Sequence, residues 1–144
     1  MIRGKSRTVF VSYSHYDARI VLPVVELMRA TGNHVFRDAD NIPPGKKWQV
    51  IIDEHLQSAD VVVVFWSRNS AKSRAVRAEY KQAIKSGKDV IPVLLDSTRL
   101  NASLKEYQYI DFVSITEGIQ FCGPFELYYD ELASHIITRL EEII

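Results

Sequence analysis

The stretch that decides the fold of this chain is VVVVFW, residues Val61–Trp66, in which all six side chains are apolar. A strand with one face in water alternates apolar and polar residues, whereas a parallel strand covered by helices on both faces is apolar throughout. We therefore expect Val61–Trp66 to be the central strand of a parallel sheet. It is far shorter than the ~20 residues that a membrane-spanning helix needs, so we expect no direct membrane insertion.

Strand-like and helix-like segments alternate on both sides of this stretch. β-branched and aromatic residues, bounded by turn formers, predict strands over residues 8–13, 34–37, 90–95 and 109–112. Apolar residues at helical spacing predict helices over residues 21–28, 48–56, 71–86 and 124–144.

This alternation predicts a three-layer, flavodoxin-like α/β fold with about five parallel strands in the order 2-1-3-4-5 and helices on both faces. The chain has 144 residues, 47% hydrophobic and 25% charged, so we expect residues 1–144 to form a single domain. In this strand order, ligands bind beyond the carboxyl ends of the first and third strands. The loops to consider are therefore residues 13–17, 38–46 and 66–73.

Three residues carry narrower expectations about packing. Pro23 lacks a backbone donor, so we expect the first helix to begin close to it and not at Asp17. Pro92 suggests a strand position that needs no donor to a neighbouring strand. Trp48 opens the apolar stripe of the second helix, and we expect it to belong to the core.

Charge and composition exclude several kinds of site. Eighteen Lys and Arg offset eighteen Asp and Glu, so no global charge favours nucleic acid. The candidate metal ligands are dispersed, which predicts no metal site and no internal disulfide: they are His15, His34, His55, His135 and Cys122. Neither a Gly-x-Gly-x-x-Gly run nor a P-loop is present, so a redox dinucleotide cofactor lacks its signal. The polar N-terminal residues and the single cysteine favour the cytoplasm.

Three segments at the expected loops resemble the Toll/interleukin receptor homology (TIR) domain family, in its prokaryotic form. Residues 9–17, VFVSYSHYD, resemble the first box of the family. Residues 35–48, which contain VFRD and PPGKKW, resemble the second box and its long loop. Residues 58–67, with Glu79 in the next helix, are similar to the central strand and active helix. The resemblance covers residues 8–95 clearly, and its three boxes occur in the family's order and spacing.

Glu79 stands out on its predicted helix by position. Helical periodicity gives this helix a buried stripe of Val76, Tyr80, Ala83 and Ile84 and an exposed stripe of Arg74, Arg77, Lys81 and Lys85. Glu79 falls on the border of the buried stripe away from the cations, and its neighbours at i±3 and i±4 offer no ion-pair partner. An ordinary boundary glutamate is the more common interpretation of this pattern, whereas the family resemblance favours a functional one. For the cations, we favour a solvated helix face.

The resemblance implies an enzyme that cleaves the nicotinamide–ribose bond of NAD+, which is then a substrate and not a cofactor. Glu79 is the implied catalytic residue, because departing nicotinamide leaves an oxocarbenium-like sugar that a fixed carboxylate stabilises. Candidate substrate-binding residues lie in or directly beside the three loops: Tyr13, Ser14, Arg37, Asp38, Trp66, Ser67 and Ser73. Tyr13 and Trp66 also suit core positions. Hydrolysis, cyclisation and base exchange share the first step, so the product stays open.

The long loop resembles the principal assembly loop of the family. It comprises Asp40, Asn41, Ile42, Pro43, Pro44 and Gly45. Together with the preceding Asp38, Asp40 gives the loop acidic charge that suits the basic helix of a second copy, and head-to-tail contacts that do not close into a ring would build a filament. The resemblance therefore implies self-association through TIR–TIR contacts, in innate immune signalling or antiviral defence.

Ala75 departs from the family pattern, because many TIR enzymes carry an aromatic residue four positions before the glutamate. This departure favours the main alternative, a non-catalytic scaffold that acts by homotypic TIR–TIR interaction. A nucleoside deoxyribosyltransferase also uses a glutamate on a similar architecture and remains a second alternative. A phosphate-receiving regulator is rejected, because the third strand ends in Phe65-Trp66-Ser67 without an aspartate.

Overall fold

The computed structural model describes residues 7–37, 45, 47–113 and 134–138 of the chain. Its sheet has five strands in the order β2-β1-β3-β4-β5, and every neighbouring pair is parallel. The strands are β1 (Thr8–Ser12), β2 (His34–Arg37), β3 (Val61–Trp66), β4 (Asp89–Leu94) and β5 (Ile110–Asp111). The sheet therefore confirms the predicted fold class and strand order.

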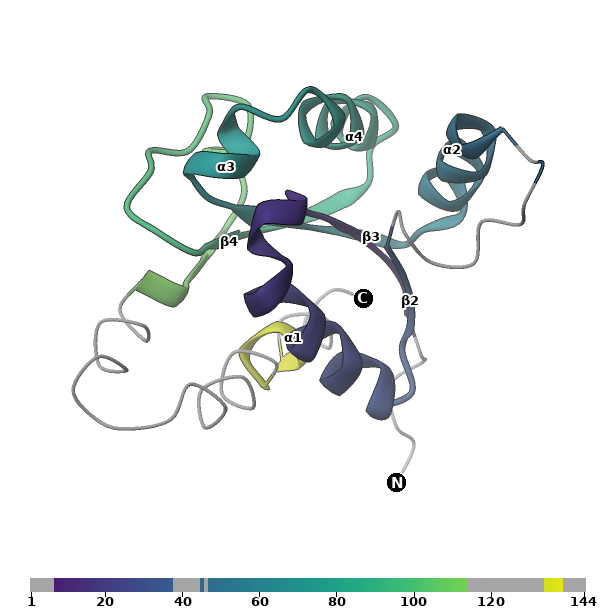
Figure 1. Cartoon of the computed structure of the whole chain (residues 1–144), viewed down its shortest axis with the longest axis horizontal. Coiled ribbons are helices and arrows are strands. Elements are labelled where there is room, and N and C mark those ends of the chain that lie inside the picture. Colours follow the sequence, from purple (N-terminus) through teal and green to yellow (C-terminus); the bar gives the residue numbers. More distant parts are fainter. Residues whose placement is uncertain (1–6, 38–44, 46, 114–133, 139–144) are drawn as a thin grey trace.

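Helices cover both faces of this sheet, as Figure 1 shows. One face carries α2 (Trp48–Ser58), α3 (Arg68–Ala71) and α4 (Arg74–Lys85). The other face carries α1 (Ala18–Ala30), which follows the 3-10 turn η1 (His15–Asp17), together with the helical residues 134–138. None of the helices within the described ranges combines the length and the apolarity needed to span a bilayer.

The central strand β3 is buried along its whole length because each face meets a helical layer. Val61, Val63 and Phe65 belong to the hydrophobic cluster that contains α1, and the alternate residues belong to the cluster that contains α2 and α4. Full burial of one such side chain contributes roughly 1.5–3 kcal/mol. The doubly covered strand thus explains the uninterrupted apolar run in the sequence.

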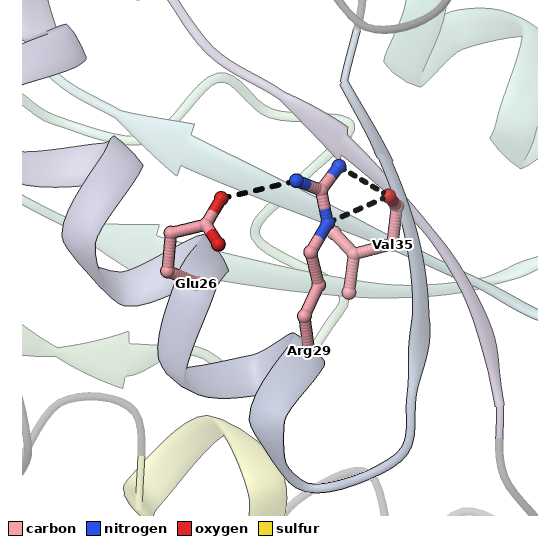
Figure 2. A network of polar contacts seen from close by, with 3 residues as sticks. All are labelled: Glu26, Arg29 and Val35. Atoms are coloured by element: carbon pink, nitrogen blue, oxygen red, sulfur yellow. Dashed lines mark hydrogen bonds and ion pairs between the residues drawn. The ribbon is translucent and has the colours of Figure 1, made fainter.

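The edge strand β2 is tied to α1 by Arg29, as Figure 2 shows. Nη2 and Nε of Arg29 donate to the backbone carbonyl oxygen of Val35, at 2.8 and 3.3 Å. Nη1 also forms an ion pair of 3.0 Å with the exposed Glu26, one turn earlier on α1. An exposed pair of this kind contributes little stability, so the main effect of Arg29 is to occupy a backbone acceptor on the edge strand.

Two local expectations are wrong. The helix α1 begins at Ala18, five residues before Pro23. Pro23 removes one helical hydrogen bond near the N-terminal end, but Val21 and Val24 are fully buried on either side of it, and their packing outweighs that loss.

Trp48 is 57% exposed and is not a core residue. It is the first residue of α2, and the buried face of that helix is supplied further along by Ile52 and Leu56.

Other segments follow the sequence more closely. The amide of Leu95 donates a hydrogen bond to the carbonyl oxygen of Trp66 on β3. Because successive backbone amides of a strand point to opposite sides, the backbone nitrogen of Pro92 faces away from β3. On that side β5 pairs only at Val93 and Leu94, which makes a donor at Pro92 unnecessary. Within the predicted helix 124–144, only residues 134–138 lie in the described ranges, and they are helical.

Candidate functional site

Buried polar side chains gather at one edge of the sheet. Across the described ranges, six polar or charged residues are buried: Ser12, Ser14, Asp17, Ser67, Ser70 and Glu79. They lie at the carboxyl ends of the neighbouring strands β1 and β3, in the segments that follow them, and on α4. Burying a polar group costs free energy unless it is hydrogen-bonded, so this concentration marks the edge as the candidate site.

Glu79 lies on α4 and points toward the end of β1. The residue is 7% exposed, and Oε1 accepts a 2.6 Å hydrogen bond from Oγ of the fully buried Ser12. Successive side chains of a strand point to opposite faces. Phe10 therefore packs in the cluster of α4 while Val11 packs in that of α1, and Ser12 returns to the face on which α4 lies.

Asp17 connects the segment after β1 to the segment after β3. Its Oδ2 accepts a short hydrogen bond from Oγ of Ser67, and its Oδ1 accepts a 2.9 Å bond from Nδ2 of Asn69. Both donors belong to the turn that opens α3. One buried carboxylate thus fixes the separation of two site loops that lie about 50 residues apart in sequence.

Serine side chains determine where the two short helices of this region begin. Ser67 and Ser70 form a capping box at the start of α3, in which Oγ of Ser67 accepts from the amide of Ser70 at 3.1 Å. Oγ of Ser73 accepts from the amide of Val76 at 3.2 Å and caps α4. The helix predicted over residues 71–86 is therefore α4, which begins three residues later than expected and follows the separate short helix α3. Ser73 fixes the start of α4, the helix that carries Glu79.

Asp96, just beyond β4, braces the same region from the other side. Its carboxylate accepts the amides of Arg68 and Thr98, at 2.8 and 2.9 Å. Partial burial raises the pKa of Asp96. Hydrogen bonds from Thr98 and from the Arg68 backbone, together with the positive charge of Arg68, outweigh that effect and hold its pKa below the ordinary value of 3.8.

The predicted substrate-binding residues separate into several groups. Ser14, Ser67 and Ser73 lie at the polar edge, where their hydroxyls accept backbone amides. Tyr13 is buried in the cluster of α1, on the opposite face from Glu79. Trp66 is buried against Tyr80, and its Nε1 donates to the carbonyl of Arg99 at 3.1 Å. Both aromatic rings are thus part of the core.

The remaining predicted positions lie on or near the second loop. Arg37 ends β2 and is half-buried beside Val11 of β1. Asp38 lies outside the described residues, as do Asp40, Asn41, Ile42, Pro43 and Pro44. Gly45 is described: it is exposed and has a φ of 85°, a backbone conformation that favours glycine. The assembly role of this loop stays a prediction.

Ser12 and Asp17 were not among the predicted site residues. The alternation of side chains along β1 could have predicted Ser12. Ser12 lies an even number of residues from Phe10, so both side chains point to the face of the sheet that α4 covers, whereas Tyr13 points to the other face. Asp17 ended a predicted loop, but nothing local indicates that its partners are Ser67 and Asn69. In the portion of the chain that the structure describes, no three His, Cys, Asp or Glu residues lie close enough together to hold a metal ion.

Fold and site together define a flavodoxin-like α/β domain with a buried carboxylate beside the carboxyl ends of β1 and β3. The model of the TIR domain family matches residues 9–121, and the chain belongs to this family. No curated protein sequence matches the chain.

Solved structures that share the fold include the following three. The TIR domain of the Toll-related receptor TRR-2 from Hydra magnipapillata has a TM-score of 0.73 at 14% identity, covering 95% of this chain and 99% of that one. A 2-deoxyribosyltransferase from Bacillus psychrosaccharolyticus has a TM-score of 0.59 at 16% identity, covering 78% and 92%. The TIR domains of the activated Roq1 resistosome, which recognises the effector XopQ, have a TM-score of 0.52 at 21% identity, covering 91% and 83%.

Proposed function

We propose that this TIR domain is an NAD+ nucleosidase that breaks the bond between nicotinamide and ribose, with Glu79 as the catalytic carboxylate. The observation that carries the proposal is the placement of Glu79: its carboxylate is buried on α4 and hydrogen-bonded at the end of β1. A structural glutamate on a helix border usually turns to water. A carboxylate held at the ligand-binding edge of the sheet suits electrostatic catalysis instead.

In the proposed reaction, the bond from C1′ of the ribose to the nicotinamide nitrogen breaks, and its electron pair leaves with neutral nicotinamide. Positive charge develops on the sugar ring, and the carboxylate of Glu79 stabilises it. Water then attacks C1′ and releases a proton, which gives ADP-ribose. An internal nucleophile in place of water would give a cyclic product, and both outcomes share the step in which Glu79 acts.

Self-association in a defence or immune-signalling pathway is part of the proposal, with the activity in the cytoplasm. The activated Roq1 resistosome contains TIR domains of the same fold, which supports an assembled state for this chain as well. The basic face of α4 offers exposed charge to a second copy, through Arg74, Arg77, Lys81 and Lys85. We therefore expect NAD+ cleavage to be measured best at high protein concentration.

The test is product analysis after concentrated wild type and Glu79→Gln are incubated with NAD+. Glu79→Gln keeps the shape of the side chain and removes its charge, so we expect turnover to fall by roughly a hundredfold or more. Glu54→Gln, at an exposed position on α2, is the matched control and should keep the wild-type rate. Equal rates for wild type and Glu79→Gln would refute the catalytic role.

A non-catalytic scaffold is the second candidate function, and Ala75 favours it. Ala75 is exposed on α4, one turn before Glu79, where a ring would have offered a stacking surface. A scaffold would assemble at high concentration, as measured by light scattering, without consuming NAD+. The deoxyribosyltransferase with the same fold suggests a further assay, because base exchange between nucleosides without NAD+ loss would identify that chemistry.

A further inference from the structure

We propose that Ser12 is the positioning residue for Glu79, holding its carboxylate in the orientation that stabilises the reacting sugar. The inference rests on the proposed function and assigns a role to a second residue of that site. Ser12 contacts Glu79 at 2.6 Å, and we assign it no contact with the substrate.

The two partners differ in how firmly they are held. Ser12 is the last residue of β1 and lies beside Val64 of the central strand, so its backbone is fixed by the sheet. Glu79 reaches the same point from α4 through a longer side chain, which has more rotatable bonds than that of serine. A strand-mounted hydroxyl therefore sets the direction of a helix-mounted carboxylate across 67 residues of sequence.

The chemistry of the contact also suits this role. A hydroxyl that donates to a carboxylate forms a short, charge-assisted bond, and 2.6 Å lies within that range. Ser12 is fully buried and Glu79 nearly so, so water cannot readily take the place of the hydroxyl when it is removed. Ser12→Ala should therefore leave Oε1 of Glu79 without this hydrogen bond and change the orientation of the carboxylate.

The expected kinetic signature is a fall in kcat with little change in KM. Because Ser12 is assigned no contact with the substrate, the affinity for NAD+ should change by less than about twofold, whereas stabilisation of the transition state is lost. A hydrogen bond to a charged group corresponds to a roughly ten- to hundredfold change in rate. A merely structural link between α4 and β1 would instead change stability and leave kcat of the folded protein intact.

The experiment compares wild type, Ser12→Ala, Ser12→Cys and Ser12→Thr in the 144-residue chain, with NAD+ as substrate. Ser12→Cys nearly keeps the volume of the side chain, but a thiol is a weak hydrogen-bond donor. Its kcat should therefore fall about as far as that of Ser12→Ala. Ser12→Thr keeps the hydroxyl and should restore most of kcat; if its extra methyl prevents folding, the Cys and Ala variants still decide. Val64→Ala, which removes buried volume beside Ser12 on the same face, controls for loosened packing and should lower stability more than kcat.

Each outcome has a distinct meaning. Loss of kcat in Ser12→Ala and Ser12→Cys, with KM retained, supports the positioning role. Wild-type kcat in folded Ser12→Ala, alongside an inactive Glu79→Gln, overturns the role of Ser12 and leaves the proposed function standing. Wild-type protein that does not cleave NAD+, or a fully active Glu79→Gln, overturns both.

Discussion

Replacing Asp17 by alanine should destabilise the domain, and the size of the effect follows from its two hydrogen bonds. The variant removes the acceptor of two hydrogen bonds, one from the Ser67 hydroxyl and one from the Asn69 side-chain amide. Ser67 is buried, whereas Asn69 is exposed. Asn69 can turn to water at little cost. A buried donor without an acceptor costs about 1–3 kcal/mol, and Oγ of Ser70, 3.4 Å from that of Ser67, offers partial compensation. We therefore expect Asp17→Ala to lower the free energy of unfolding by about 2 kcal/mol.

Equilibrium unfolding in urea, followed by circular dichroism, measures this loss. Asp17→Asn keeps an amide oxygen for Ser67 but loses the charge, so it should cost about half as much, because charge-assisted bonds are roughly twice as strong as neutral ones. Asp89→Ala, at an exposed position that opens β4, is the control and should change stability by less than about 0.5 kcal/mol. If Asp17→Ala is no less stable than Asp89→Ala, the proposed bracing of the two site loops is wrong.

Two further variants test how the site region is held. Ser73→Ala removes the cap of α4 and should cost about 1 kcal/mol in urea unfolding; an unchanged midpoint would contradict the capping role. The lowered pKa of Asp96 predicts that its contribution to stability is present above pH 3.8 and is lost as pH falls through the lower, folded-state pKa. Asp96→Asn should therefore have a lower free energy of unfolding than wild type at pH 7, and the difference should shrink as the pH is lowered. A difference that does not change with pH would contradict this role of the Asp96 carboxylate.

Much of the fold was predictable because it depends on patterns that repeat along the chain. The apolar run Val61–Trp66 specifies a strand buried on both faces, and the alternation around it specifies a parallel sheet. The errors occurred where packing overrode a local rule. Pro23 lies inside α1 because buried valines surround it, and Trp48 is exposed because the buried face of α2 begins further along.

The candidate site was less predictable, because its hydrogen bonds join residues far apart in sequence. Periodicity placed Glu79 at the border of the buried face of its helix, and the structure buries it. Its partner depends on how α4 is rotated and shifted over the sheet, which periodicity does not determine. The same holds for Asp17, whose partners lie 50 and 52 residues away.

The packing of the aromatic residues sharpens the question of how this site would hold a nicotinamide or adenine ring. Trp66 and Tyr13 are core residues, and Ala75 offers no ring, so none of them supplies a stacking face. Tyr16, 88% exposed in the turn η1 beside Asp17, is an aromatic residue at this edge that is open to a ligand. A second copy of the chain could supply such a ring as well. Specific activity that is constant with protein concentration would favour Tyr16, whereas specific activity that rises with concentration would favour a ring supplied by assembly.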